Sequence, residues 1–286
     1  MALRAGARVL PNLSPKPGYI AIRPFFCSRG NTDPVHLHSL HFKPENLTAT
    51  PKIPAVVIVH GLLGAKENWR AICKVLSKEL QTDVYSLDLR NHGSSPQTPQ
   101  MAYSSMAEDL VTFADKKNLK EVVLIGHSMG GRVAMETAFN HRSRISSLVL
   151  VDVAPNSPTV IDTFRKYIES MKRIEEKGVD SLSSANKILK ESCSDEATRQ
   201  FLLTNLRRNH STGQYSFRVP LTILLNNLEM LKQFHPNPER ENFDKPTLCI
   251  AGSRSNYVKP DQYPAVRQYF PNIKFETVDT GHWGKY

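Results

Sequence analysis

Residues 122–131 read VVLIGHSMGG, an apolar run that ends in a serine enclosed by glycines. The run predicts a buried strand, and apolar residues spaced by three and four over 130–141 predict a helix directly after it. A serine on such a sharp turn is held in a strained conformation with its hydroxyl exposed, while Gly126 and Gly130 leave space where a Cβ would clash. An ordinary glycine-rich turn is the alternative, but the strand-turn-helix context favours a nucleophile at Ser128.

Similar apolar runs alternate with helical patterns along most of the chain. Strands are expected over 55–59, 84–87, 122–125, 148–151, 247–251 and 273–278, and helices near 67–80, 105–116, 130–141 and 261–270. Continuous apolar runs suit strands that are covered on both faces. The pattern therefore predicts an α/β fold with a mainly parallel sheet and helices on both of its faces.

The alternation stops after Asp152, and a polar, helix-rich segment follows. In this segment apolar residues such as Phe164, Ile168 and Met171 recur at helical spacing. We expect a helical cap inserted into the core. The predicted organisation is a leader over 1–32, the first part of the core over 33–153, the cap over 154–243 and the second part of the core over 244–286.

The base for Ser128 must come from a distant part of the chain, which contains ten histidines. His282 follows the last predicted strand, within a Gly-His-Trp loop. A lone histidine in a loop is usually only a surface residue. Here the order along the chain, with the serine first and the histidine last, favours His282 as the general base. His127 is expected to be a supporting residue, because neighbours on a tight turn diverge.

The acid that would orient His282 is expected at Asp152. The loop over 252–256 is the usual place for this acid, but it carries no carboxylate. Asp152 ends the preceding strand and so lies at the same edge of the sheet as Ser128. A buried carboxylate there could accept a hydrogen bond from the imidazole. The alternative is an aspartate that only caps the turn after its strand.

Two backbone N–H groups are expected to form an oxyanion hole. The sequence HGLLG at 60–64 follows a predicted strand, and we choose the N–H of Leu62 as one donor. The second is the N–H of Met129, at the start of the helix after Ser128. A merely structural glycine-rich turn is the alternative reading of 60–64. No cofactor and no metal are expected, because a serine with a paired base supplies the groups that acyl transfer needs.

The charge of the chain is unevenly distributed. Its net charge is +10, and residues 1–32 carry five basic residues and no acidic one. The remaining excess lacks a basic run, so a nucleic-acid partner is not expected. An acid-free, arginine-bearing leader predicts import into mitochondria, with a disordered basic tail as the alternative. No apolar stretch is long enough to span a bilayer, so no transmembrane segment is expected.

With these residues in place, the sequence resembles the α/β-hydrolase superfamily, and within it the subgroup of the mitochondrial abhydrolase domain-containing protein eleven. The resemblance covers about residues 34–283. It rests on HGLLG at 60–64, DLRNHGSSP at 88–96, GHSMGG at 126–131, VDVAP at 151–155 and LLTNL at 202–206.

The resemblance implies an α/β-hydrolase fold and a serine esterase or lipase-like activity on small acyl esters, with the acid after the sixth strand as at Asp152. It further implies relatives that transfer acetyl groups to alcohols, a location in the mitochondrial matrix and a link to the 2-oxoglutarate dehydrogenase complex. Members of the subgroup carry a helix after the histidine, so the core over 244–286 is expected to lack its final helix. A catalytically weak binding or stabilising partner of a mitochondrial complex remains an alternative.

Overall fold

The computed structural model describes residues 33–45, 51–158, 160–209 and 211–282, so the predicted leader over 1–32 lies outside the described residues. One sheet has the strand order β1-β3-β2-β4-β5-β8-β9. Its strands are β1 (Ser39–Phe42), β2 (Ala55–Val59), β3 (Val84–Leu87), β4 (Val122–His127), β5 (Ile145–Val151), β8 (Thr247–Gly252) and β9 (Ile273–Val278). Among these strands only the pairing of the edge strand β1 with β3 is antiparallel, so the predicted mainly parallel sheet is confirmed.

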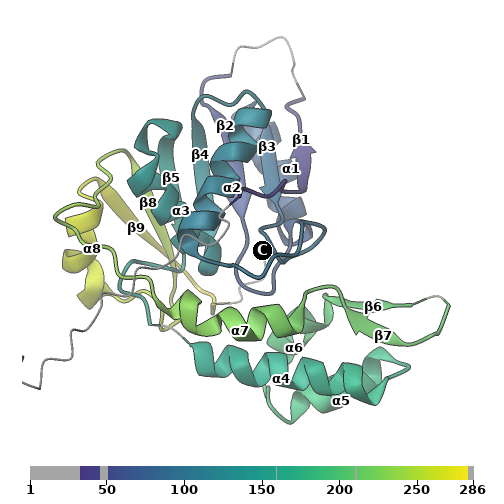
Figure 1. Ribbon diagram of the computed structural model, residues 1–286. Coiled ribbons are helices and arrows are strands. Elements are labelled where there is room, and N and C mark those ends of the chain that lie inside the picture. Colours follow the sequence, from purple (N-terminus) through teal and green to yellow (C-terminus); the bar gives the residue numbers. More distant parts are fainter. Residues whose placement is uncertain (1–32, 46–50, 159, 210, 283–286) are drawn as a thin grey trace, which may run out of the picture. The chain divides into compact units, whose positions relative to one another are not determined.

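Helices cover both faces of this sheet because its central strands are apolar on both sides. Val57 and Val59 belong to an apolar cluster with residues of α2 (Tyr103–Lys116) and α3 (Met129–Asn140). Val56 and Ile58 point the opposite way, into a cluster with residues of the short turn η1 (Lys66–Trp69) and α1 (Arg70–Leu80). Figure 1 shows α2 and α3 in front of the strands. Each large side chain that is fully buried in this way stabilises the fold by about 1.5–3 kcal/mol.

The order of the strands creates a crevice at one edge of the sheet. From β2 the chain passes to β3 on one side, and it later returns to β4 on the other side of β2. Ligands of open parallel sheets bind outside the carboxyl ends of the strands at such a switch in direction. The loop over 60–64 and the residue Ser128 follow β2 and β4, so both lie at this crevice.

A largely helical segment separates β5 from β8, and we call it the cap. It contains α4 (Ile161–Lys177), α5 (Leu182–Lys190), α6 (Glu196–Leu203), the hairpin of β6 (Leu206–Arg208) and β7 (Tyr215–Phe217), and α7 (Leu221–Lys232). Figure 1 shows α4 and α7 side by side. The sequence does not predict the hairpin, because its three-residue strands are too short for an alternating pattern to be visible.

After β8 the chain forms the turn η3 (Pro260–Gln262) and the short helix α8 (Tyr263–Tyr269) before β9. Across the described ranges, no helix is long and apolar enough to cross a bilayer.

Candidate active site

Ser128 occupies the single residue between β4 and α3, with a φ of 52° and a ψ of −117°. Such a backbone conformation is unfavourable for a residue with a side chain and persists only where the surroundings hold it. Here neighbouring backbone atoms pack closely against the turn. A Cβ added at Gly126 would lie 2.4 Å from the carbonyl oxygen of Gly130, and one added at Gly130 would lie 2.4 Å from that of His60. The turn therefore depends on the two glycines named in the sequence pattern.

His282 connects the two other predicted residues of the site. Its Nε2 lies 3.1 Å from the Oγ of Ser128, and its Nδ1 lies 2.6 Å from Oδ2 of Asp152. Because a carboxylate only accepts hydrogen bonds, the Nδ1 position carries the proton and Nε2 is left as an acceptor for the serine hydroxyl. The structure thus brings Ser128, His282 and Asp152 together in one hydrogen-bonded chain, although 130 residues separate the histidine from the aspartate.

Asp152 directly follows β5, and three groups donate hydrogen bonds to its carboxylate. Oδ1 accepts from the N–H of Gly252 at 3.1 Å, while Oδ2 accepts from His282 and from the hydroxyl of Ser255. Burial by itself raises the pKa of Asp152, but these hydrogen bonds outweigh burial and hold the pKa below its usual range. The carboxylate is therefore charged at neutral pH and can orient and stabilise the imidazole.

Sequence reasoning missed Ser255 and Tyr257, which support this pair from the loop after β8. The ring of Tyr257 stacks on that of His282, with centroids 3.6 Å apart and an angle of 6° between the planes. The backbone N–H of Tyr257 donates a hydrogen bond to the Ser255 hydroxyl, and this hydroxyl donates one to the carboxylate of Asp152. The sequence offers no specific signal for either residue, because the contact of Ser255 with Asp152 forms only after β8 packs beside β5.

His127 lies beside the site, with its ring 4.9 Å from that of His282 between centroids. Its Nε2 donates to the backbone carbonyl oxygen of His282 at 3.1 Å. Burial, helped by the nearby His282 ring, lowers the pKa of His127 to about 3. The neutral ring therefore holds the backbone of His282, which agrees with the supporting role expected from the sequence.

The loop after β2 approaches the serine closely. It forms a tight turn closed by a hydrogen bond from the N–H of Gly64 to the carbonyl oxygen of Gly61, 2.9 Å long. A Cβ added at Gly61 would lie 3.2 Å from that of Ser128, so glycine permits this approach. Leu62 and Met129 both line the cavity that Ser128 also lines. The structure therefore places the two residues predicted to carry the oxyanion donors at the same cavity as the serine.

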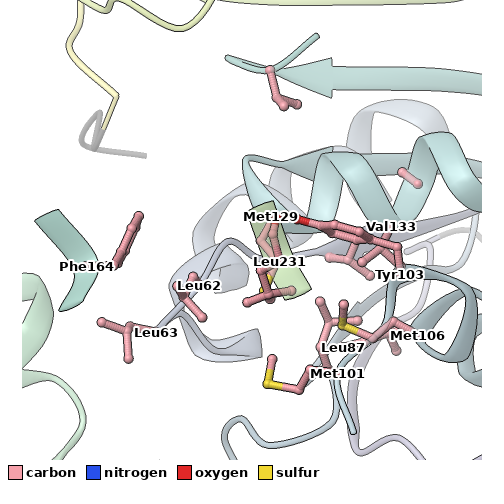
Figure 2. Packing of buried hydrophobic residues seen from close by; sticks show 14 of the residues in the cluster. Leu62, Leu63, Leu87, Met101, Tyr103, Met106, Met129, Val133, Phe164 and Leu231 are labelled. Carbon is pink, nitrogen blue, oxygen red and sulfur yellow. Dashed lines mark hydrogen bonds between the residues drawn. The ribbon is translucent and has the colours of Figure 1, made fainter. Parts of the chain in front are cut away.

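The cavity at Ser128 has a volume of about 40 Å³ and an apolar wall drawn from the core and the cap. Its lining includes Tyr103, Val153, Ile161, Phe164, Leu231 and Tyr257. Figure 2 shows Leu62, Met129 and Leu231, which come from three separate segments, next to one another. The apolar lining favours an apolar group next to the carbonyl that reaches the serine, and a volume of this size holds only a small group.

Comparisons with known proteins agree with this geometry. Residues 54–286 match a family described as alpha/beta hydrolase fold. The chain is 36% identical over 234 residues to the sn-1-specific diacylglycerol lipase ABHD11 of Danio rerio, covering 80% of this chain and 72% of that protein. It is also 36% identical over 246 residues to a Saccharomyces cerevisiae protein named "Probable alcohol acetyltransferase", with the same two coverages.

Among solved structures, a marine microorganism esterase superposes with a TM-score of 0.78 at 30% sequence identity, covering 87% of this chain and 93% of that one. The family match extends over most of the chain, and the mainly parallel sheet and the serine turn are those that the sequence predicts. The chain therefore belongs to the α/β-hydrolase family.

Proposed function

We propose that this protein is a serine hydrolase that cleaves carboxylic esters through an acyl-enzyme on Ser128. One observation carries the proposal: the hydrogen-bonded chain from the Ser128 hydroxyl through both nitrogens of His282 to the carboxylate of Asp152. This arrangement supports a nucleophile, a general base and an orienting acid. The relatives named as a lipase and as an esterase support the same chemistry.

In the acylation step, the Ser128 oxygen attacks the ester carbonyl and its proton passes to Nε2 of His282. The negative charge on the tetrahedral oxygen is stabilised by the N–H groups of Leu62 and Met129. Asp152 stabilises the imidazolium that forms, since its carboxylate is charged and bonded to Nδ1. The bond to the leaving alcohol then breaks, and the alcohol takes the proton from Nε2.

In the deacylation step, a water molecule replaces the alcohol. His282 removes one proton from the water as its oxygen attacks the acyl carbonyl, and the same two N–H groups hold the new oxyanion. When the bond to Ser128 breaks, the serine oxygen takes the proton back from Nε2. The products are a carboxylic acid and the free enzyme, so both half-reactions use the same residues.

The apolar cavity at Ser128 supports an ester with an apolar acyl chain as the substrate. One relative is named as a diacylglycerol lipase, which supports a lipid ester in particular.

A second candidate function is acyl transfer to an alcohol, which the yeast relative named as an alcohol acetyltransferase favours. It needs no additional residue, because an alcohol can take the place of water at the acyl-enzyme. Product analysis in the presence of ethanol separates the two functions. Hydrolysis converts the acyl group to the free acid alone, whereas transfer to ethanol forms an ethyl ester.

Labelling with a fluorophosphonate probe tests the proposed nucleophile. The expected result is one covalent adduct on the wild-type protein at Ser128 and none on Ser128→Ala. An unreactive wild-type protein that also leaves p-nitrophenyl esters intact would instead support a binding or stabilising partner without hydrolase activity.

A location in the mitochondrial matrix and an association with the 2-oxoglutarate dehydrogenase complex belong to the same proposal. The acid-free basic leader over 1–32 supports import. Co-purification of the complex with the tagged full chain from mitochondria tests the association. An intact leader on the mitochondrial protein would argue against cleavage after import.

A further inference from the structure

Asn205 connects the cap to the loop that carries Leu62. It directly precedes β6, and its side chain is completely buried. Its Nδ2 donates a hydrogen bond of 2.7 Å to the carbonyl oxygen of Leu63, which is 142 residues away along the chain. A buried amide that donates across such a distance links two separate parts of the fold, because neither part forms this contact alone.

Leu63 has a strained backbone conformation within this loop. It is the third residue of the Gly61–Gly64 turn and has a φ of 63°, which the corresponding position of a type II turn requires. Glycine is preferred there, and a leucine in the left-handed region is strained. The loop therefore needs contacts that stabilise this conformation over the alternatives.

Both backbone groups of Leu63 receive such a contact. Its N–H donates to Nε2 of His92 at 3.0 Å, and Nδ1 of His92 is fixed by the carbonyl oxygen of Arg90. Burial and the neighbouring His60 ring lower the pKa of His92 to about 3, so the ring stays a neutral acceptor. The core thus holds one side of Leu63, and Asn205 of the cap holds the other.

Asn205 is itself held in one orientation. Its Oδ1 accepts from Nε of Arg218 at 3.1 Å, which leaves the amide nitrogen directed at Leu63. The backbone N–H of Arg218 also bonds the carbonyl oxygen of Asn205. Nη1 of Arg218 lies 3.4 Å from Oε2 of Glu67, in the turn that follows the loop in the core. The cap therefore presents a fixed donor to the loop.

We propose that Asn205 is a positioning residue through which the cap sets the oxyanion hole, by holding Leu63 so that the N–H of Leu62 faces the reacting carbonyl. The inference rests on the proposed function, since Leu62 acts as a donor only in acyl transfer at Ser128. It assigns the cap a part in catalysis in addition to lining the cavity. Loss of the contact lets the turn relax and moves the Leu62 donor, which is needed more in the transition state than in substrate binding.

The test compares two isosteric substitutions in the cap. Asn205→Asp keeps the shape of the side chain and an acceptor for Arg218 but removes the donor to Leu63. Asn227→Asp is the matched control, because Asn227 is also a buried cap asparagine, and its Nδ2 donates to a core carbonyl at Pro99, outside the oxyanion loop. Each variant of the full chain is assayed for hydrolysis of p-nitrophenyl butyrate, inhibition by butylboronic acid and thermal unfolding.

For Asn205→Asp we expect kcat to fall about 10- to 100-fold with KM changed less than about threefold, since loss of a whole oxyanion donor costs about 100- to 1000-fold. Affinity for the boronic acid, which forms a tetrahedral adduct on the serine, should fall by a similar factor. Asn227→Asp should keep both values within about threefold of wild type.

Three outcomes overturn the inference. Wild-type kcat and boronic acid affinity in Asn205→Asp would show that the contact does not set the donor. Equal losses in both variants that follow their thermal stability would show a role in folding alone. A wild-type protein that neither hydrolyses the ester nor labels at Ser128 would remove the proposed function and this inference with it, whereas the first two outcomes leave that function intact.

Discussion

Three strained residues lie at the site. Leu63, Ser128 and Asp152 have φ values of 63°, 52° and 49°, and all three carry side chains. Conformations of this kind cost about 1 to 3 kcal/mol each and persist only where the surroundings fix them. Here each residue is fixed by hydrogen bonds or by close packing of the backbone. The strain therefore holds a reactive hydroxyl, an orienting carboxylate and a turn beside the predicted oxyanion donor in one geometry.

Replacing the carboxylate is expected to disable the base. In Asp152→Asn, an amide can present its NH₂ group to Nδ1 of His282 and favour the tautomer in which Nε2 carries the proton. We expect kcat/KM for a p-nitrophenyl ester to fall by about a thousandfold to ten-thousandfold. Asp261→Asn and Asn256→Ala serve as controls and should retain activity within a few fold. A crippling effect of Asp261→Asn with an active Asp152→Asn would place the acid in the loop after β8.

Removing the hydroxyl of Ser255 is expected to weaken the charged form of Asp152. The hydrogen bond to a carboxylate contributes about 1.5–3 kcal/mol, so Ser255→Ala should lose a free energy of unfolding of this order at pH 7. Because the folded pKa of Asp152 is lowered, this stabilisation is present above the unfolded value of about 3.9 and is lost as pH falls through the folded pKa.

Urea unfolding of wild type and Ser255→Ala from pH 7 down to pH 3 measures this effect. The difference between the two proteins should be full above about pH 5 and should shrink below about pH 4. A difference that stays constant over the whole range would mean that the hydroxyl stabilises the fold independently of the charge on Asp152.

Among single residues, those within a local pattern could be predicted. Ser128 lies in a five-residue motif, and the order of the chain leads to His282 and Asp152. Ser255 and Asn205 could not be assigned in this way, because each acts on a residue more than 100 positions away. No local spacing records such a contact, since it exists only after β8 or the cap packs on the core.

The turn between β4 and α3 is the element most sensitive to substitution. Gly126→Ala places a methyl group 2.4 Å from a backbone oxygen that cannot move without distorting the helix start. We expect a loss of about 2 kcal/mol or more in the free energy of unfolding, as for overpacked cores.

Gly281→Ala is the matched control for this substitution. Among the described residues, apart from its two chain neighbours, nothing lies within 4 Å of a Cβ added at Gly281. The free energy of unfolding of Gly281→Ala should therefore change by less than about 1 kcal/mol. Urea denaturation curves of both variants check the difference. Equal stability of the two alanine variants would contradict the close packing of the turn.

Strands were easier to predict from the sequence than the residues at which helices begin. The runs over 55–59, 84–87 and 273–278 coincide with β2, β3 and β9, because apolar residues fill β2 and alternate with polar ones at the start of β9. Helix starts were less certain. The helix predicted near 67–80 begins with the 3₁₀ turn η1, whose backbone hydrogen bonds join residues three positions apart, and continues as α1.

At the scale of the whole molecule, burial of neutral histidines is expected to make the protein sensitive to acid. Burial lowers the pKa of His92 and His127 to about 3, against about 6.5 in the unfolded chain. Between pH 3 and pH 6.5 these two histidines bind more protons in the unfolded state than in the folded state. The free energy of unfolding that they affect is therefore highest above about pH 6.5 and decreases as the pH falls toward 3.

Each of the two histidines contributes a slope of about 1.4 kcal/mol per pH unit. Together they should lower the free energy of unfolding by roughly 2.8 kcal/mol for each unit that the pH falls near pH 5. Urea unfolding at several pH values from 7 to 4.5 measures this slope. A free energy of unfolding that stays constant over this range would show that the two rings can be protonated in the folded protein.

The most direct test of the account is to detect the acyl-enzyme. Full-length protein is mixed with p-nitrophenyl butyrate, quenched in acid within the first turnovers, digested and analysed by mass spectrometry. The proposed chemistry predicts a butyryl group on the peptide that contains Ser128, and neither the group nor ester hydrolysis in Ser128→Ala. Continued hydrolysis by Ser128→Ala, or a butyryl group on another residue of the active wild-type protein, would contradict it.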